Sequence, residues 1–196
     1  MNEIEKLAEL FAQFPGIGPR QARRFVYFLL RNNDTYRKSL AHLITDIKKN
    51  VQQCSSCFRH STMKGAQKVC RHCDDTKRDP TKLMIIEKDT DIDAMEKSGT
   101  YKGKYLVLGG TIKLTGKKQP HIREKELLTR LTGDKDVKEI ILAFPATADG
   151  EYTTDYLRTK LPDAITVTVL GRGLSTGSEL EYADSETLRN AFKNRA

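Results

Sequence analysis

The chain has 196 residues, enough to bury a core in one domain or in two small ones. Its net charge is +8, from 34 Lys and Arg against 26 Asp and Glu. No apolar run approaches the length of about 18 residues that a membrane span needs, and no signal peptide opens the chain, so we expect a cytoplasmic protein.

The first 52 residues are predicted to be helical. Apolar residues recur at helical spacing over residues 3–13 and 19–31, and a third helix is expected to run from Asp34, as its N-cap, to Val51. The run PGIGPR at residues 15–20 separates the first two helices. Its glycines allow a sharp turn, and its second proline suits the first position of a helix. The sequence therefore predicts a helix-hairpin-helix.

The hairpin is a candidate site for phosphate groups. Gly16 and Gly18 place backbone amides at the start of the second helix, where such amides point at anions. Arg20, Arg23 and Arg24 follow in the first turns of that helix. These five residues are predicted to bind DNA through its backbone, with little sequence preference. The alternatives are an ordinary helical turn and a hairpin that serves mainly in dimerisation.

The basic charge is concentrated toward the N-terminus. Residues 1–80 contain 15 Lys and Arg against 8 Asp and Glu, a balance of +7. Residues 81–196 contain 19 against 18, a balance of +1. This asymmetry favours a polyanionic partner for one end of the molecule, and a solvated surface without a partner is the alternative.

The four cysteines form two C-x-x-C pairs, Cys54/Cys57 and Cys70/Cys73, with twelve residues between the pairs. Two such turns supply the four soft ligands of tetrahedral zinc, one ion per chain. Because every coordination position is taken, the zinc is expected to hold the fold and to perform no chemistry. A reducing cytosol favours metal, while two disulfides or a redox pair are the alternatives. The neighbouring His72 is expected not to be a ligand.

The character of the sequence changes after residue 80. Short apolar runs typical of buried strands alternate with helical stretches, which predicts parallel β-α-β units. The strands are expected at residues 83–86, 105–108, 140–144 and 165–170, and the helices near residues 91–98, 122–132 and 150–161. In such sheets, functional residues gather beyond the carboxyl ends of the strands.

Acidic residues follow the predicted strands at that edge. They are Glu87, Asp89, Asp91 and Asp93 after the first strand, and Asp149 and Glu151 after the third. Carboxylates there could hold Mg²⁺ through oxygen ligands, and helix capping in solvated loops is the alternative. The sequence contains neither a phosphate loop nor a dinucleotide fingerprint, so no nucleotide hydrolysis is predicted.

Taken together, these motifs resemble those of the bacterial recombination mediator family RecR. The resemblance follows the family's order along nearly the whole chain. It is carried by the hairpin at residues 14–20, the four cysteines with the run at 74–79, the Toprim-like segments at 85–110 and 143–157, and the closing motif at 172–184.

Two departures bear on function. The loop at residues 111–120 lacks the family's Ser-Pro-Leu-Asp-Gly type of sequence. Partner contacts that the family makes through this loop are therefore not carried over to this chain. Catalytic Toprim enzymes carry an Asp-x-Asp pair shortly before a Gly-Glu dipeptide. Aligned on Gly150 and Glu151, those positions are Pro145 and Thr147, so half of the metal-binding set is absent.

The resemblance implies a non-catalytic, ring-forming DNA clamp, typically a homotetramer, that binds single- and double-stranded DNA. It also implies RecO- and RecF-type partners, which help to load recombinase onto single strands, and association with the bacterial nucleoid. Glu87, Asp91 and Glu151 are expected to form an acidic surface for a partner. The alternative is a Mg²⁺-dependent Toprim nuclease or phosphotransfer enzyme that uses these residues and Asp93.

The expected fold is α/β with four parts. They are a helix-hairpin-helix region at residues 1–52, a small four-cysteine zinc finger at 53–79, a Toprim-like parallel α/β domain at 80–172, and a C-terminal motif and helix at 173–196 that serves in assembly.

Overall fold

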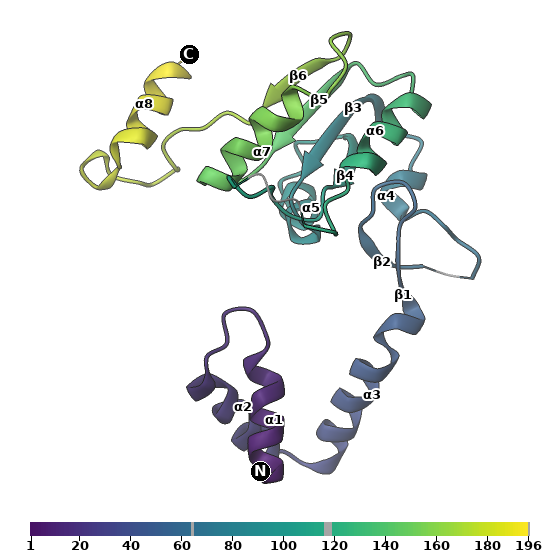
Figure 1. Cartoon of the computed structure of the whole chain (residues 1–196), viewed down its shortest axis with the longest axis vertical. Coiled ribbons are helices and arrows are strands. Elements are labelled where there is room, and N and C mark those ends of the chain that lie inside the picture. Colours follow the sequence, from purple (N-terminus) through teal and green to yellow (C-terminus); the bar gives the residue numbers. More distant parts are fainter. Residues whose placement is uncertain (64, 116–118, 196) are drawn as a thin grey trace. The chain divides into compact units, whose positions relative to one another are not determined.

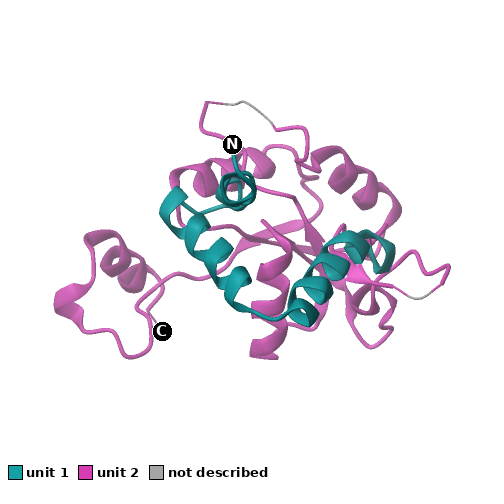
Figure 2. Ribbon diagram, turned by 90° about the horizontal axis from the view of Figure 1, so that it is seen from below, with its two compact units in different colours: residues 1–51 teal, residues 52–196 magenta. Residues whose placement is uncertain are grey.

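The computed structural model describes residues 1–63, 65–115 and 119–195. The chain divides into two compact units, residues 1–51 and residues 52–196 (Figure 2). None of the helices in the described ranges has the length and apolar character needed to cross a bilayer. Residues 116–118, in the loop that departs from the family pattern, lie outside the described residues.

The N-terminal unit opens with the predicted pair of helices, α1 (Glu3–Ala12) and α2 (Pro19–Arg31) (Figure 1). The side chain of Asn2 caps α1 by accepting a hydrogen bond from the Glu5 amide at 2.9 Å, and Glu5 accepts one from the Asn2 amide at 3.0 Å. The two helices pack around a small core formed by Ala8, Ala22 and Val26.

Helix α3 (Asp34–Asn50) differs from its prediction at both ends. Asn33 is the N-cap, and its side-chain oxygen accepts a hydrogen bond from the Tyr36 amide at 2.8 Å. Because Asn and Asp cap helices about equally well, the sequence did not distinguish Asn33 from Asp34. At the other end, Val51 is extended and opens a strand instead of closing the helix.

The C-terminal unit is built on the predicted parallel sheet of four strands. Their order across the sheet is β4 (Gly103–Val107), β3 (Asp79–Ile86), β5 (Glu139–Ala143) and β6 (Thr166–Val169). Among the described strands, β4 therefore lies at one edge of the sheet and pairs with β3 alone.

Both faces of the sheet are covered by helices (Figure 1). Successive residues of β3 point to opposite faces, so Leu83 and Ile85 enter one core while Met84 and Ile86 enter the other. The first core is closed by helices α6 (Glu124–Gly133) and α7 (Ala148–Arg158), and the second by α5 (Asp89–Ser98).

Short elements precede and follow the sheet. The small hairpin of β1 (Val51–Gln53) and β2 (His60–Thr62) and the one-turn helix α4 (Arg71–Asp74) surround the cysteines. After β6, the 3-10 helix η1 (Leu180–Tyr182) and helix α8 (Ser185–Lys193) form the C-terminal helical tail.

Candidate functional site

The four cysteines come together in one cluster. Their sulfur atoms all lie within 4.8 Å of one another, and the Sγ atoms of Cys57 and Cys70 are 3.5 Å apart. The backbone turns that allow this are a left-handed φ of 61° at Phe58, just after the first pair, and the start of α4 at Cys70. Cys54, Cys57 and Cys70 are buried, and Cys73 is half-buried.

Thiols packed this closely cannot ionise independently. Hydrogen bonds from the thiols of Cys57, Cys70 and Cys73 lower the pKa of Cys54, and the Cys70 amide also donates to Cys54 Sγ at 3.2 Å. Hydrogen bonds with the neighbouring thiols, chiefly that of Cys54, raise the pKa of Cys57. The four sulfurs are close enough to share one ion, and a soft divalent ion in tetrahedral coordination fits these donors.

His72 lies beside the cluster and contacts other side chains. Its Nδ1 is 3.2 Å from Nη1 of Arg59, and its Nε2 is 3.3 Å from Oε2 of Glu96. Within the described ranges, the four cysteines are the only group of three or more His, Cys, Asp or Glu side chains close enough to hold an ion.

The first cysteine turn is fastened to the edge strand β4. The Val107 amide donates a hydrogen bond to the carbonyl of Cys57 at 2.8 Å. Nη1 of Arg130, from α6, donates to the carbonyl of Ser56 at 3.1 Å and to that of Tyr105 in β4 at 2.7 Å. One guanidinium group thus joins the cysteine turn, the edge strand and a helix.

The second cysteine turn is fastened to the same strand by a different cation. Nζ of Lys104 donates to the carbonyls of Cys73 at 3.0 Å and Asp75 at 2.8 Å. Nearby, Glu96 accepts a hydrogen bond from the hydroxyl of Tyr105 at 2.7 Å and pairs with Arg78. Burial opposes ionisation of Glu96, but these hydrogen bonds keep its pKa below the usual range. The cluster and the sheet are therefore one connected structure.

The hairpin of the N-terminal unit has one glycine that the turn requires. Gly16 has a φ of 76°, in the region that favours glycine. Gly18 has φ −83° and ψ 167°, and a Cβ placed on it would meet no atom within 4 Å. The expectation that both glycines are needed for the turn is therefore wrong for Gly18. As the N-cap of α2, Gly18 has no side chain to bond the first-turn amides, which stay open.

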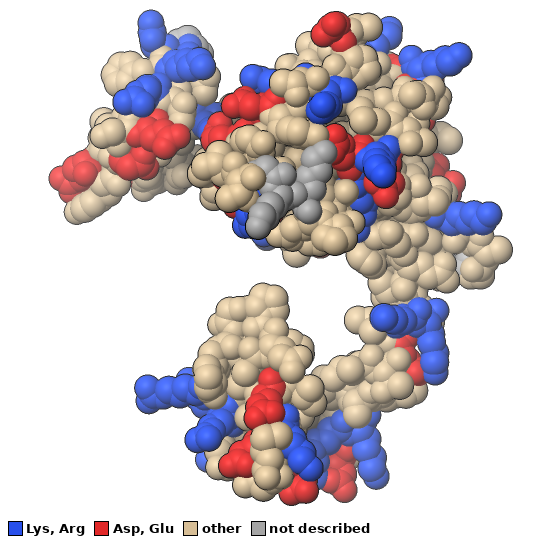
Figure 3. Space-filling view, in the orientation of Figure 1, with Lys and Arg blue, Asp and Glu red and all other residues tan. Residues whose placement is uncertain are grey.

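Three arginines lie in the first turns of α2, where these open amides are. Arg20, Arg23 and Arg24 are all exposed, and Lys and Arg side chains project from this unit in Figure 3. Nη1 of Arg24 donates to Oε1 of Gln21 at 3.3 Å. No carboxylate in the described part of the chain pairs with any of the three. Their charges are available to a ligand.

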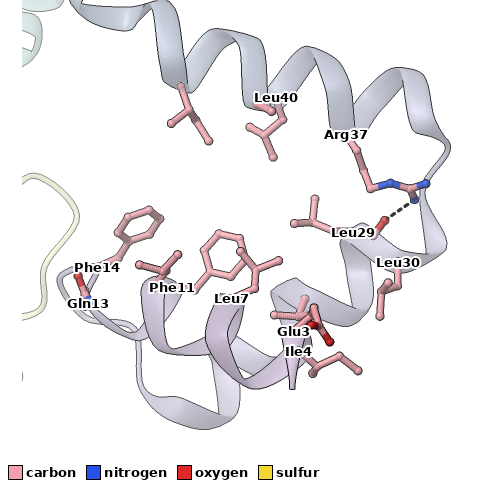
Figure 4. A pocket seen from close by; sticks show the side chains of 14 residues that line it. Glu3, Ile4, Leu7, Phe11, Gln13, Phe14, Leu29, Leu30, Arg37 and Leu40 are labelled. Carbon is pink, nitrogen blue, oxygen red and sulfur yellow. Dashed lines mark hydrogen bonds between the residues drawn. The ribbon is translucent and has the colours of Figure 1, made fainter. Parts of the chain in front are cut away.

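An apolar groove lies between the hairpin helices and α3 (Figure 4). Its volume is about 700 Å³. Its apolar lining comes from all three helices and includes Leu7, Phe11, Phe14, Leu29, Leu40 and Ile44. Along α3, Leu43, Ile44 and Ile47 are 65%, 61% and 58% exposed, which is unusual for three apolar residues on one helix face.

The acidic residues that we expect to bind a partner lie at the strand ends, but each of them contacts different neighbours. Oδ2 of Asp91 accepts a hydrogen bond from the Lys88 amide at 3.0 Å, at the start of α5. Glu151, in the first turn of α7, pairs with Arg172, and Glu87 is half-buried at the end of β3. The described carboxylates do not form a group that could hold an ion.

Two further acidic residues of the predicted set bind the segment of the cysteine turns. Oδ1 of Asp89 accepts a hydrogen bond from the His60 amide at 2.6 Å, and Oδ1 of Asp93 is 2.5 Å from Nη2 of Arg59. The sequence left helix capping and solvated loops as the alternative to Mg²⁺ binding. Asp89 and Asp93 instead make a hydrogen bond and an ion pair to the segment of the cysteine turns.

Sequence reasoning missed three cations that organise these sites, namely Lys104, Lys113 and Arg130. Each reaches a partner far away in the sequence, at separations of 31, 36 and 74 positions. A lone basic residue in a strand, loop or helix carries no pattern that indicates its distant acceptor. Only the fold brings the pairs together.

The helical hairpin, the four-cysteine cluster and the parallel sheet define a helix-hairpin-helix protein with a cysteine-rich metal site and a Toprim-type domain. Three family models match in this order: the RecR helix-hairpin-helix at residues 4–48, the Toprim domain at 81–171 and the RecR C-terminal region at 173–196. The chain belongs to the RecR family, which confirms the resemblance seen in its motifs.

Relatives named recombination protein RecR are similar over nearly their full length. The protein of Pelagibacter ubique is 37% identical over 196 residues, covering 100% of this chain and 95% of the relative. The protein of Dehalococcoides mccartyi is 40% identical over 194 residues, covering 98% and 93%. That of Parvibaculum lavamentivorans is 39% identical over 195 residues, covering 98% and 96%.

Proposed function

We propose that this protein is a non-catalytic mediator of DNA recombination and repair that binds the DNA backbone. The observation that carries the proposal is the hairpin, in which open first-turn amides of α2 lie beside Arg20, Arg23 and Arg24. Amides at a helix N-terminus and unpaired guanidinium groups both suit phosphate. Since nothing in the hairpin is suited to reading bases, single- and double-stranded DNA of any sequence are the expected ligands.

Replacing Arg23 by alanine tests the hairpin directly. Each arginine that contacts a phosphate releases counterions, so its loss is expected to lower the magnitude of the negative slope of log K against log salt by about 1. Affinity is expected to fall similarly on unrelated DNA sequences. Fluorescence anisotropy over a salt series measures both quantities. Arg158→Ala, at an exposed position of α7, is the matched control and is expected to change neither.

The outcome that rejects this role is a triple replacement of Arg20, Arg23 and Arg24 by alanine that leaves affinity and slope intact. The hairpin would then serve assembly only. Light scattering of each variant in parallel separates a lost contact from a lost oligomer.

The apolar groove supports assembly into a ring. We propose that a second copy of this chain covers the exposed face of α3, where Leu43, Ile44 and Ile47 lie in water in the single chain. The C-terminal tail offers a second contact, since Tyr182 and Phe192 are 80% and 69% exposed. Two contacts per chain suffice to close a ring, and a tetramer is the expected number. The four proposed parts are those expected from the sequence, at residues 1–52, 53–79, 80–172 and 173–196.

Zinc is the proposed occupant of the cysteine cluster. Four sulfur donors at these separations match its preference for tetrahedral thiolate coordination, which supports the proposal. With four protein ligands, the ion has no open position for water, so its role is structural.

Docking of RecO- and RecF-type partners, which would bring recombinase to single strands in the bacterial cytoplasm, is proposed at the acidic strand ends. Glu87 is the most direct test, because Asp91 caps a helix and Glu151 pairs with Arg172. Glu87→Lys is expected to weaken binding of a RecO-type protein, chiefly through a slower on-rate, and to leave DNA affinity unchanged. Surface plasmon resonance measures the on-rate for the partner and the affinity for DNA. Equal losses for partner and DNA would contradict the proposal and indicate misfolding.

The enzymatic alternative requires carboxylates that bridge metal ions about 4 Å apart. Pro145 and Thr147 occupy two of the positions where such carboxylates would stand, and Thr147 instead caps α7. Incubation of labelled DNA with Mg²⁺ or Mn²⁺ distinguishes the two functions. Cleavage that disappears in Glu87→Ala would establish the nuclease.

A further inference from the structure

One exposed face of α2 carries arginines interleaved with aromatic residues. Its members recur every three or four positions, which places them along one side of the helix, and all are exposed: Arg20, Arg24, Tyr27, Phe28 and Arg31. Tyr27 is 50% exposed and Phe28 is 54% exposed. Side chains that serve only to fill a core would be buried and free of interleaved charge. This face is therefore suited to a ligand that is both charged and aromatic.

Phe28 contacts a second exposed ring, that of Tyr36 in the first turn of α3. The two ring centroids are 5.9 Å apart, and the ring planes are nearly perpendicular, at 85°. This edge-to-face arrangement is a favourable one for aromatic pairs. Tyr36 is 43% exposed. The contact thus positions the pair while both rings keep open surface.

The aromatic pair borders a hollow of about 460 Å³ between α1, α2 and α3. This volume is within the range of roughly 300–1,000 Å³ that is typical of small-ligand sites. Four of the eight lining residues are aromatic, namely Phe11, Phe25, Phe28 and Tyr36. Arg24 also lines the hollow, and its hydrogen bond goes to the neutral side chain of Gln21. The hollow therefore combines ring surfaces with a guanidinium charge that no carboxylate in its lining offsets.

A single DNA strand offers what this surface lacks. Its bases stack on aromatic rings and guanidinium planes, and the phosphates between the bases suit the neighbouring arginines. In a duplex the faces of the bases are already stacked on one another. A second copy that met this face with its own would bring the same arginines together, and like charges repel.

We propose that the hollow at Phe28 and Tyr36 is a stacking site for an unpaired base, so that the hairpin unit binds single-stranded DNA more tightly than duplex DNA. The inference rests on the proposed binding of the DNA backbone by the hairpin, and it adds the class of DNA that the site prefers. Because every base has a face that can stack, the site introduces little sequence preference.

The test measures the affinity of the full-length protein for three labelled ligands of equal length by fluorescence anisotropy. They are oligothymidylate, an abasic strand with the same backbone, and a duplex. The wild type is expected to bind oligothymidylate about tenfold more tightly than the abasic strand, in line with the contribution of one stacked base. Phe28→Leu keeps the apolar bulk and removes the ring, so it is expected to abolish this preference. Its salt slope is expected to stay unchanged, because no phosphate contact is lost.

Two control variants make the result specific. Tyr36→Phe keeps the ring and is expected to keep the preference for oligothymidylate. Tyr152→Leu, at a half-buried aromatic position of α7, is expected to behave as the wild type.

The proposal is overturned if the wild type binds oligothymidylate and the abasic strand equally, or if Phe28→Leu keeps the preference. A Phe28→Leu protein that keeps the preference but has a lower molar mass in light scattering would assign the hollow to a second copy instead. Arg23→Ala separates this proposal from the backbone contact on which it rests, because it is expected to weaken binding of both strands alike. Weaker binding of both strands by Arg23→Ala, with no preference in the wild type, would overturn the stacking site and leave backbone binding in place.

Discussion

Cys57→Ser is expected to release zinc and to unfold the segment around residues 52–78. A serine hydroxyl is a poor zinc ligand, and metal binding supplies on the order of 10 kcal/mol of folding free energy in small cysteine sites. The segment has a small apolar core of its own, since its buried cluster consists of three cysteines and Met63, with Val69 and Cys73 packed against it. Zinc content by a colorimetric chelator assay and melting by calorimetry measure the effect.

The control for this substitution is Ser56→Ala, which changes the neighbouring side chain in the same turn and leaves all four sulfurs in place. It is expected to retain one zinc ion per chain. A Cys57→Ser protein with full zinc content and an unchanged melting temperature would show that the ligand assignment is wrong.

Gly150→Ala is expected to destabilise the C-terminal unit strongly, although alanine is normally the better residue within a helix. A Cβ on Gly150 would lie 2.0 Å from the carbonyl oxygen of Pro145 and 3.0 Å from its carbonyl carbon. Both atoms belong to the backbone, so no side chain can move aside. Overpacking of this kind costs about 3 kcal/mol, which corresponds to a fall in melting temperature of roughly 6–12 °C.

Gly133→Ala provides the opposite case within the same unit. Gly133 ends α6, and its Cβ position has no atom within 4 Å, so alanine is expected to be neutral or slightly stabilising. Circular dichroism during heating compares the two variants. Equal melting temperatures would mean that the close approach of Pro145 to α7 does not exist in solution.

The local parts of the fold were predictable because short patterns determine them. The hairpin helices, the cysteine cluster and the order of strands and helices follow from apolar spacing, two C-x-x-C pairs and the alternation of runs. The start of α3 was ambiguous, since Asn33 and Asp34 are both good caps.

What the sequence did not reveal depends on contacts between distant residues. Gly18 looked like a turn residue because it repeats the glycine at position 16, yet its backbone is ordinary. The acidic residues looked like one group because they follow neighbouring strands. Their partners, such as Arg172 for Glu151 and Lys113 for Asp149, come from segments that only the tertiary fold brings near.

The attachment of the cysteine turns to β4 has a consequence for solubility. An uncovered edge strand is a template for pairing with another molecule, and proteins usually blunt such edges with charge or cover them. The edge strand β4 contains the buried apolar residues Tyr105, Leu106 and Val107, and its Val107 amide donates a hydrogen bond to the carbonyl of Cys57. At the opposite edge, β6 is four residues long and includes two threonines. Loss of the metal would therefore uncover β4, the more apolar of the two edge strands. Zinc depletion would then lead to aggregation through β4 before the sheet itself unfolds.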